Sequence, residues 1–96
     1  MLTKHYSPKT KIRLNVVNPH IDELVLNFAD NVQSSLFSLD LSPEGDLIVA
    51  ASNLYNMLRE LVKYALIHNC KSIAVANIAN NGIGMAINDR LKRAAA

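Results

Sequence analysis

Apolar and polar residues alternate between residues 11 and 17, with a period of two. The apolar positions are Ile12, Leu14 and Val16, and polar residues stand between them. This alternation predicts a strand with one buried face. Asn18-Pro19 ends it, because proline has no backbone N–H to continue a ladder. The polar residues 1–10 before it predict an extended lead-in.

Residues 20–40 are harder to interpret, because the segment 20–33 fits two periods. Ile21, Leu24, Val25 and Phe28 would share a helical face, whereas Leu24, Leu26 and Phe28 would share a strand face. We favour a short helical turn or loop over 19–22 and a strand over 23–28, since a helix here would have only about three turns. Residues 35–40 predict another strand, and the sequence Ser-Pro-Glu-Gly at 42–45 predicts a turn.

The clearest pattern is a helical one over residues 46–68, with apolar residues three and four positions apart. Asp46 is a good N-cap, and Asn69 lies near the expected C-terminus of this helix. The apolar, partly β-branched segment 72–78 predicts a buried strand, and 84–95 predicts a second helix. A long helix between two apolar strands is what a parallel crossover requires. The order therefore predicts an α/β fold: an open, mostly parallel sheet of about four strands with a long crossover helix and a C-terminal helix.

Composition narrows the class of protein without revealing its activity. The chain has 96 residues, a formal net charge of +2 and a single cysteine, Cys70. That length accommodates one domain, and one cysteine excludes an internal disulfide framework. No apolar stretch is long enough for a signal peptide or a membrane span. We expect a small cytoplasmic domain that binds no metal, because the histidines are not at ligand spacing, and we expect Cys70 to be an apolar filler.

The turn before the last helix is the best local candidate for a binding site. Gly82 and Gly84 follow a strand and open a helix, where backbone N–H groups can bind an anion. The motif lacks the third glycine of a dinucleotide fingerprint and the lysine of a phosphate-binding loop. The alternative is a tight turn, in which Gly82 supplies a positive φ and Gly84 permits close packing.

Polar residues concentrate on the two predicted helices. Asp89 and Arg93 are four positions apart and can pair along one face. Arg59 lies in the most apolar helix, so we expect an ion pair with an acid of a neighbouring element, or a ligand contact. We assign Arg59, Asn88, Asp89 and Arg90 structural or interface roles, and we expect Lys92 and Arg93 to form a solvated face.

Several motifs together resemble a known family. The first is Lys-His-Tyr-Ser-Pro-Lys at 4–9, followed by Arg13-Leu14. The others are LSPEGDL at 41–47, AASNLYNMLREL at 50–61 and GIGMAINDRLKRAA at 82–95. Their order and spacing resemble the C-terminal domain of the long form of threonylcarbamoyl-AMP synthase over nearly the whole chain. Two departures are Val62, where the family usually has aspartate, and a longer segment over 63–72.

The resemblance implies a parent enzyme that condenses threonine, bicarbonate and ATP into threonylcarbamoyl-AMP, for modification of tRNA. It implies that catalysis, with ATP and magnesium, belongs to an N-terminal domain, and that this domain has no cofactor or catalytic residue of its own. Residues 1–10 would be an interdomain linker remnant, with His5, Tyr6 and Pro8 facing the catalytic pocket, and 11–96 would be a Rossmann-like accessory domain. The chain would then be an excised domain or a split-gene product.

Partners follow from the same resemblance. We expect the N-terminal synthase domain as the main partner, with tRNA-modification partners of the parent enzyme beside it and no membrane. Two alternatives stay open on the residues alone. One is a stand-alone nucleotide- or phosphate-binding module, based on Gly82 and Gly84. The other is a protein-interaction module, including a homo-oligomer, because a short chain with a very apolar helix often needs a partner.

Overall fold

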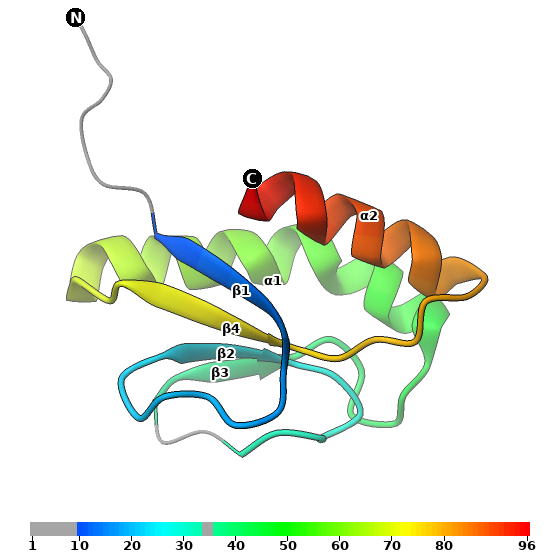
Figure 1. The fold of residues 1–96 in the computed structure, drawn as a ribbon, viewed down its shortest axis with the longest axis horizontal. Helices are drawn as coiled ribbons and strands as arrows, with labels where there is room; N and C mark the ends of the chain where they lie inside the picture. Colours follow the sequence, from blue (N-terminus) through cyan, green and yellow to red (C-terminus); the bar gives the residue numbers. More distant parts are fainter. Residues whose placement is uncertain (1–9, 34–35) are drawn as a thin grey trace, which may run out of the picture.

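A computed structural model describes residues 10–33 and 36–96 (Figure 1). Strands and helices follow one another in the predicted order. They are β1 (Lys11–Val16), β2 (Leu24–Asn27), β3 (Ser38–Asp40), α1 (Leu47–His68), β4 (Ser72–Ala76) and α2 (Ile83–Ala95). The predicted α/β class is therefore confirmed. The strands are shorter than predicted, most clearly β3, which begins at Ser38.

The sheet has four strands in the order β1-β4-β2-β3, and every neighbouring pair is parallel. Helix α1 joins β3 to β4 and is the predicted crossover. Strand β4 lies between β1 and β2, so residues far apart in sequence become neighbours. Ile73 of β4 is in register with Ile12 of β1 on one side and with Leu24 of β2 on the other.

Helix α1 has a defined residue at each end. The Asp46 carboxylate accepts hydrogen bonds from the backbone N–H groups of Ile48 and Val49, at 2.9 and 3.3 Å. Asn69 adopts the left-handed conformation at the C-cap (φ 58°), and its N–H donates to the Ala65 carbonyl. Asparagine tolerates this conformation better than most residues. Both expectations for these caps are confirmed, and the segment that departs from the family pattern begins as helix, since α1 continues to His68.

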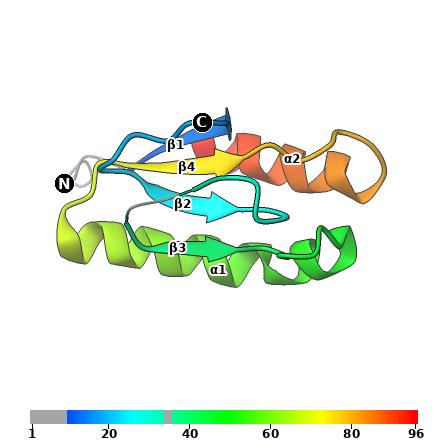
Figure 2. The same cartoon turned by 90° about the horizontal axis from the view of Figure 1, so that it is seen from below.

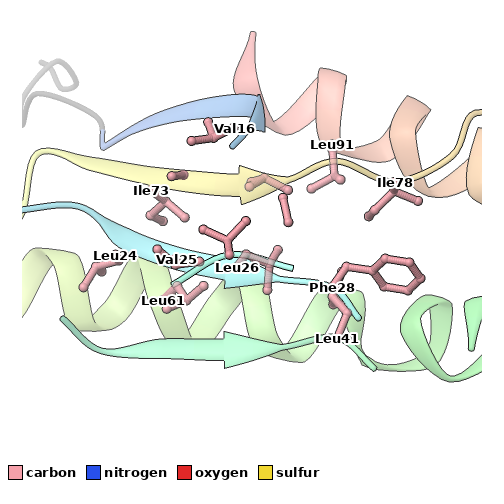
Figure 3. Close-up of a cluster of buried hydrophobic side chains, with 14 of the residues drawn as sticks. Val16, Leu24, Val25, Leu26, Phe28, Leu41, Leu61, Ile73, Ile78 and Leu91 are labelled. Atoms are coloured by element: carbon pink, nitrogen blue, oxygen red, sulfur yellow. The ribbon is translucent and has the colours of Figure 1, made fainter. Parts of the chain in front are cut away.

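The core lies between the sheet and the helices. Figure 2 shows both helices behind the sheet, with α1 along the β3 side and α2 near β1. Accordingly, α1 contacts β2, β3 and β4, whereas α2 contacts β1 and α1. Leu61 of α1 and Leu91 of α2 belong to the same buried cluster as Leu24, Leu26 and Ile73 of the central strands (Figure 3).

The two central strands are buried along nearly their whole length. Alternation along β2 places Leu24 and Leu26 on one face and Val25 and Asn27 on the other. The Asn27 side chain holds the following loop: its amide nitrogen donates to the Val32 carbonyl, and its oxygen accepts from the N–H groups of Phe28 and Val32. This loop therefore stays close to the carboxyl end of β2.

Candidate functional site

The turn that precedes α2 is built around two glycines with different constraints. Gly82 has φ +55°, and a Cβ added there would meet nothing within 4 Å. Gly84 is buried, and a Cβ there would lie 2.0 Å from the Ala79 carbonyl oxygen. No side chain fits in that space, so Gly84 is required for the close approach of α2 to the end of β4. The positive φ and the close packing are the features of the tight-turn interpretation.

The same turn uses its first amide groups internally. The Gly84 N–H donates to the Asn81 carbonyl at 3.0 Å, and the Met85 N–H donates to the Gly82 carbonyl at 3.1 Å. These two donors therefore have acceptors without a ligand. Anion binding at Gly82 and Gly84 stays a prediction, and this geometry does not favour it.

Asn88 fastens α2 to the turn. Its side-chain amide donates to the Ile78 carbonyl at 2.9 Å and to the Asn80 side-chain oxygen at 3.3 Å. Because the Ile78 carbonyl follows β4, this contact satisfies a backbone acceptor that the strand ladder does not reach. Asn88 therefore makes a structural contact within the chain.

A groove of about 680 Å³ runs between α1 and α2. Its apolar lining comes from Leu54 and Leu58 of α1 and from Ile87 and Leu91 of α2. Polar or aromatic residues also line it, and they are Tyr55, Arg90 and Arg93. The structure thus brings Arg90, one of the predicted interface residues, to an apolar surface formed by both helices.

Arg59 does not make the predicted ion pair. It is exposed on α1 and has no ion pair among residues 10–33 and 36–96. Its guanidinium lies 5.8 Å from the centre of the Tyr55 ring, one helical turn earlier. The expected ion pair is thus corrected to a cation–π contact, which arises because Arg59 faces solvent rather than a neighbouring strand. Asp89 and Arg93 do pair, at 3.1 Å, as their spacing predicts.

A buried carboxylate that the sequence analysis missed lies just before β2. Glu23 is 1% exposed. It accepts from Arg13 Nε at 2.8 Å and from Arg13 Nη2 at 2.7 Å, and also from the Ser72 hydroxyl at 2.7 Å and the His20 backbone N–H at 2.8 Å. A signal was present in the sequence, because a charged residue directly before the apolar run Leu24-Val25-Leu26 must be accommodated at the sheet.

These bonds change the ionisation of the pair. The hydrogen bonds from Arg13 lower the pKa of Glu23 from 4.5 to about 2; burial opposes them, and the bonds from His20 and Ser72 support them. The hydrogen bond with Glu23 raises the pKa of Arg13. The pair lines a second depression of about 640 Å³ at the amino ends of the strands, together with Lys11, Lys71 and Cys70. The Glu23 carboxylate therefore remains ionised, and groups of the same chain donate hydrogen bonds to both of its oxygens.

The other predicted residues have simpler places. Cys70 is a free, half-buried thiol that packs against the core. His5, Tyr6 and Pro8 lie outside the described residues. Within the described ranges, no three histidine, cysteine, aspartate or glutamate side chains gather as a metal site would require. In the same ranges, neither helix combines the length and apolar character needed to cross a bilayer.

Comparison with known proteins identifies the chain from its whole length. The family model described as "Threonylcarbamoyl-AMP synthase, C-terminal domain" matches residues 1–96. Neither a curated protein nor a solved structure matches the chain. The match agrees with the motifs at 41–47, 50–61 and 82–95, which lie in the turn before α1, in α1 and in α2. The chain belongs to the family of threonylcarbamoyl-AMP synthase C-terminal domains.

Proposed function

We propose that this chain is a non-catalytic accessory domain of a threonylcarbamoyl-AMP synthase. In this role it would support or cover the nucleotide site of an N-terminal synthase domain, and the enzyme would serve tRNA threonylcarbamoyladenosine modification. ATP, with magnesium, would bind the catalytic domain. Residues 1–10, including His5, Tyr6 and Pro8, would connect the two domains across the mouth of the catalytic pocket.

The observation that carries this proposal is how the buried polar side chains are used. In the described part of the chain they are Glu23, Asn27 and Ser42, and each is bonded within the chain. The Ser42 hydroxyl accepts from the Asp46 N–H, and none of the buried side-chain polar atoms there lacks a partner. A catalytic acid, base or nucleophile needs a free reactive atom next to a substrate. These side chains organise the fold instead.

The carboxyl edge of the sheet supports the same conclusion. Ligands of open parallel sheets often bind there. Here the Asp40 carboxylate accepts from the Asp30 and Ser42 N–H groups, at 2.9 and 3.0 Å, and the Asn53 amide donates to the Leu41 carbonyl at 2.9 Å. The Asp40 and Asn53 side chains therefore hold the loops at this edge together, and their hydrogen bonds are made within the chain.

A covering role has a chemical reason. Threonylcarbamoyl-AMP is a mixed anhydride, and water can hydrolyse it before the threonylcarbamoyl group is transferred. A domain that closes the site would exclude water from the intermediate. The benefit of such a domain is thus expected in the yield of intact product as well as in the rate.

The test combines this chain with a separately produced catalytic domain from the same organism. Pyrophosphate release and intact threonylcarbamoyl-AMP are measured with threonine, bicarbonate and Mg-ATP. We expect no synthesis by this chain alone, and more intact product per ATP consumed when both are present than with the catalytic domain alone. Synthesis by this chain alone would contradict the proposal. So would an unchanged yield of intact threonylcarbamoyl-AMP per ATP when this chain is present at a saturating concentration.

A further inference from the structure

The groove between α1 and α2 has an unusual combination of surfaces. Its floor is apolar, with Ile87 and Leu91 buried and Leu54 and Leu58 partly buried. Small side chains line it on both helices, and they are Ala51 of α1 and Ala86 and Ala94 of α2. Small residues allow another backbone to come close to a helix pair. The groove therefore has the shape and chemistry of a helix-binding surface.

The rim of this groove carries an excess of positive charge. Arg93 is paired with Asp89, but Arg90 has no ion pair in the described ranges. Arg59 does not line the groove itself; it contacts the groove residue Tyr55 and has no ion pair in these ranges either. Tyr55 lines the groove and is 69% exposed, with Arg59 stacked over it. Exposed tyrosine and arginine beside an apolar floor are the residues that most often dominate binding energy in protein interfaces.

We propose that the α1–α2 groove is the surface that docks on the catalytic domain. Its occupant would be a segment of that domain with apolar side chains flanked by carboxylates. The apolar side chains would cover Leu54, Leu58 and Ile87, and the carboxylates would pair with Arg90 and Arg59. This inference rests on the proposed function and goes further, because it assigns the docking surface and the chemistry of the partner segment.

The groove suits a protein segment better than a free phosphate compound. Most of its lining is aliphatic, and the charged residues that line it are Arg90 and Arg93, of which Arg93 is already paired with Asp89. An amphipathic segment would satisfy both parts of this surface, since its apolar side would meet the floor and its acidic flank would meet the rim.

The experiment measures the affinity of this chain for the catalytic domain by titration calorimetry. Arg90→Glu reverses a rim charge, and Ala86→Trp fills the groove; both residues are exposed, and circular dichroism checks that each variant is folded. Lys63→Glu and Lys71→Glu are matched controls, because these exposed lysines do not line the groove. We expect about tenfold or greater weakening for the groove variants and less than about twofold change for the controls.

A third variant, Asp89→Asn, should change the affinity in the opposite direction. Asp89→Asn removes the carboxylate that neutralises Arg93, so an acidic partner should bind more tightly, and the difference should fall at high salt. If the Arg90→Glu and Ala86→Trp variants bind the catalytic domain as tightly as the wild type does, the groove is not the docking surface, and the proposed function is unaffected. Absence of wild-type binding would overturn both. If the wild-type chain binds tRNA but not the catalytic domain, and Arg90→Glu abolishes the tRNA binding, the groove binds tRNA and the proposed occupant is wrong.

Discussion

Arg13 and Glu23 form a two-point ion pair across a strand that lies between them. Arg13 belongs to β1, Glu23 directly precedes β2, and β4 separates these strands in the sheet. The Nε–Oε2 and Nη2–Oε1 distances are 2.8 and 2.7 Å. Ser72 and Ala74 of β4 are small, which leaves room for the arginine side chain to cross. The pair therefore ties together three strands that come from distant parts of the chain.

Replacing Glu23 by glutamine should weaken the fold. The amide keeps the shape but loses the charge, so Arg13, Ser72 and His20 lose their charged acceptor. Hydrogen bonds to a buried charged group contribute about 1.5–3 kcal/mol, and we expect a loss of roughly this size in the free energy of unfolding, measured with urea. Asp89→Asn is the matched control at an exposed pair, where a few tenths of a kcal/mol are expected. Equal effects at both sites would contradict this account.

Stability should depend on acid through the same carboxylate. The pKa of Glu23 is about 2 in the folded chain and 4.5 without the fold. Between these values the unfolded state binds more protons, so stability falls as pH decreases. The contribution of Glu23 is complete above about pH 5 and is lost progressively towards pH 2. Urea unfolding of wild type and Glu23→Gln along this pH series checks it: the gap between them should narrow towards pH 2, and a constant gap would disprove the linkage.

The two glycines before α2 should respond differently to alanine. At Gly84 the added Cβ collides with the Ala79 carbonyl oxygen, so α2 must move away from the end of β4. We expect a cost of about 3 kcal/mol or more in unfolding free energy, with NMR shifts around Ala79 and Asn88. At Gly82 the Cβ has open space, and only its backbone conformation opposes alanine, at about 1–2 kcal/mol. A larger loss at Gly82 than at Gly84 would contradict the packing argument.

Asp46 should contribute to stability through the start of α1. Asp46→Ala leaves the Ile48 and Val49 N–H groups without their acceptor, and such a loss typically costs about 1 kcal/mol. Asp46→Asn can still accept these bonds and should retain most of the stability. Thermal unfolding followed by circular dichroism checks both variants. If alanine and asparagine behave alike, the cap is not the source of the effect.

Sequence patterns were sufficient where a residue's environment depends on its near neighbours. The alternation at Ile12, Leu14 and Val16 predicted β1, and the helical spacing after Asp46 predicted α1 with its cap. The spacing of Asp89 and Arg93 predicted their pair. Gly82 and Gly84 were recognised as special, although only the Ala79 carbonyl shows why no side chain fits at Gly84.

Contacts that depend on the order of the strands in the sheet could be known only from the tertiary structure. Placing β4 between β1 and β2 brings Arg13, Ser72 and Glu23 together, and a sequence pattern with a range of a few residues cannot specify that order. The same limit applies to Arg59, whose predicted acid partner never comes near it, and to the groove, whose walls are more than thirty residues apart along the chain at Leu54 and Ile87. Local periodicity determined which elements form and which face of each is apolar, and packing determined which faces meet.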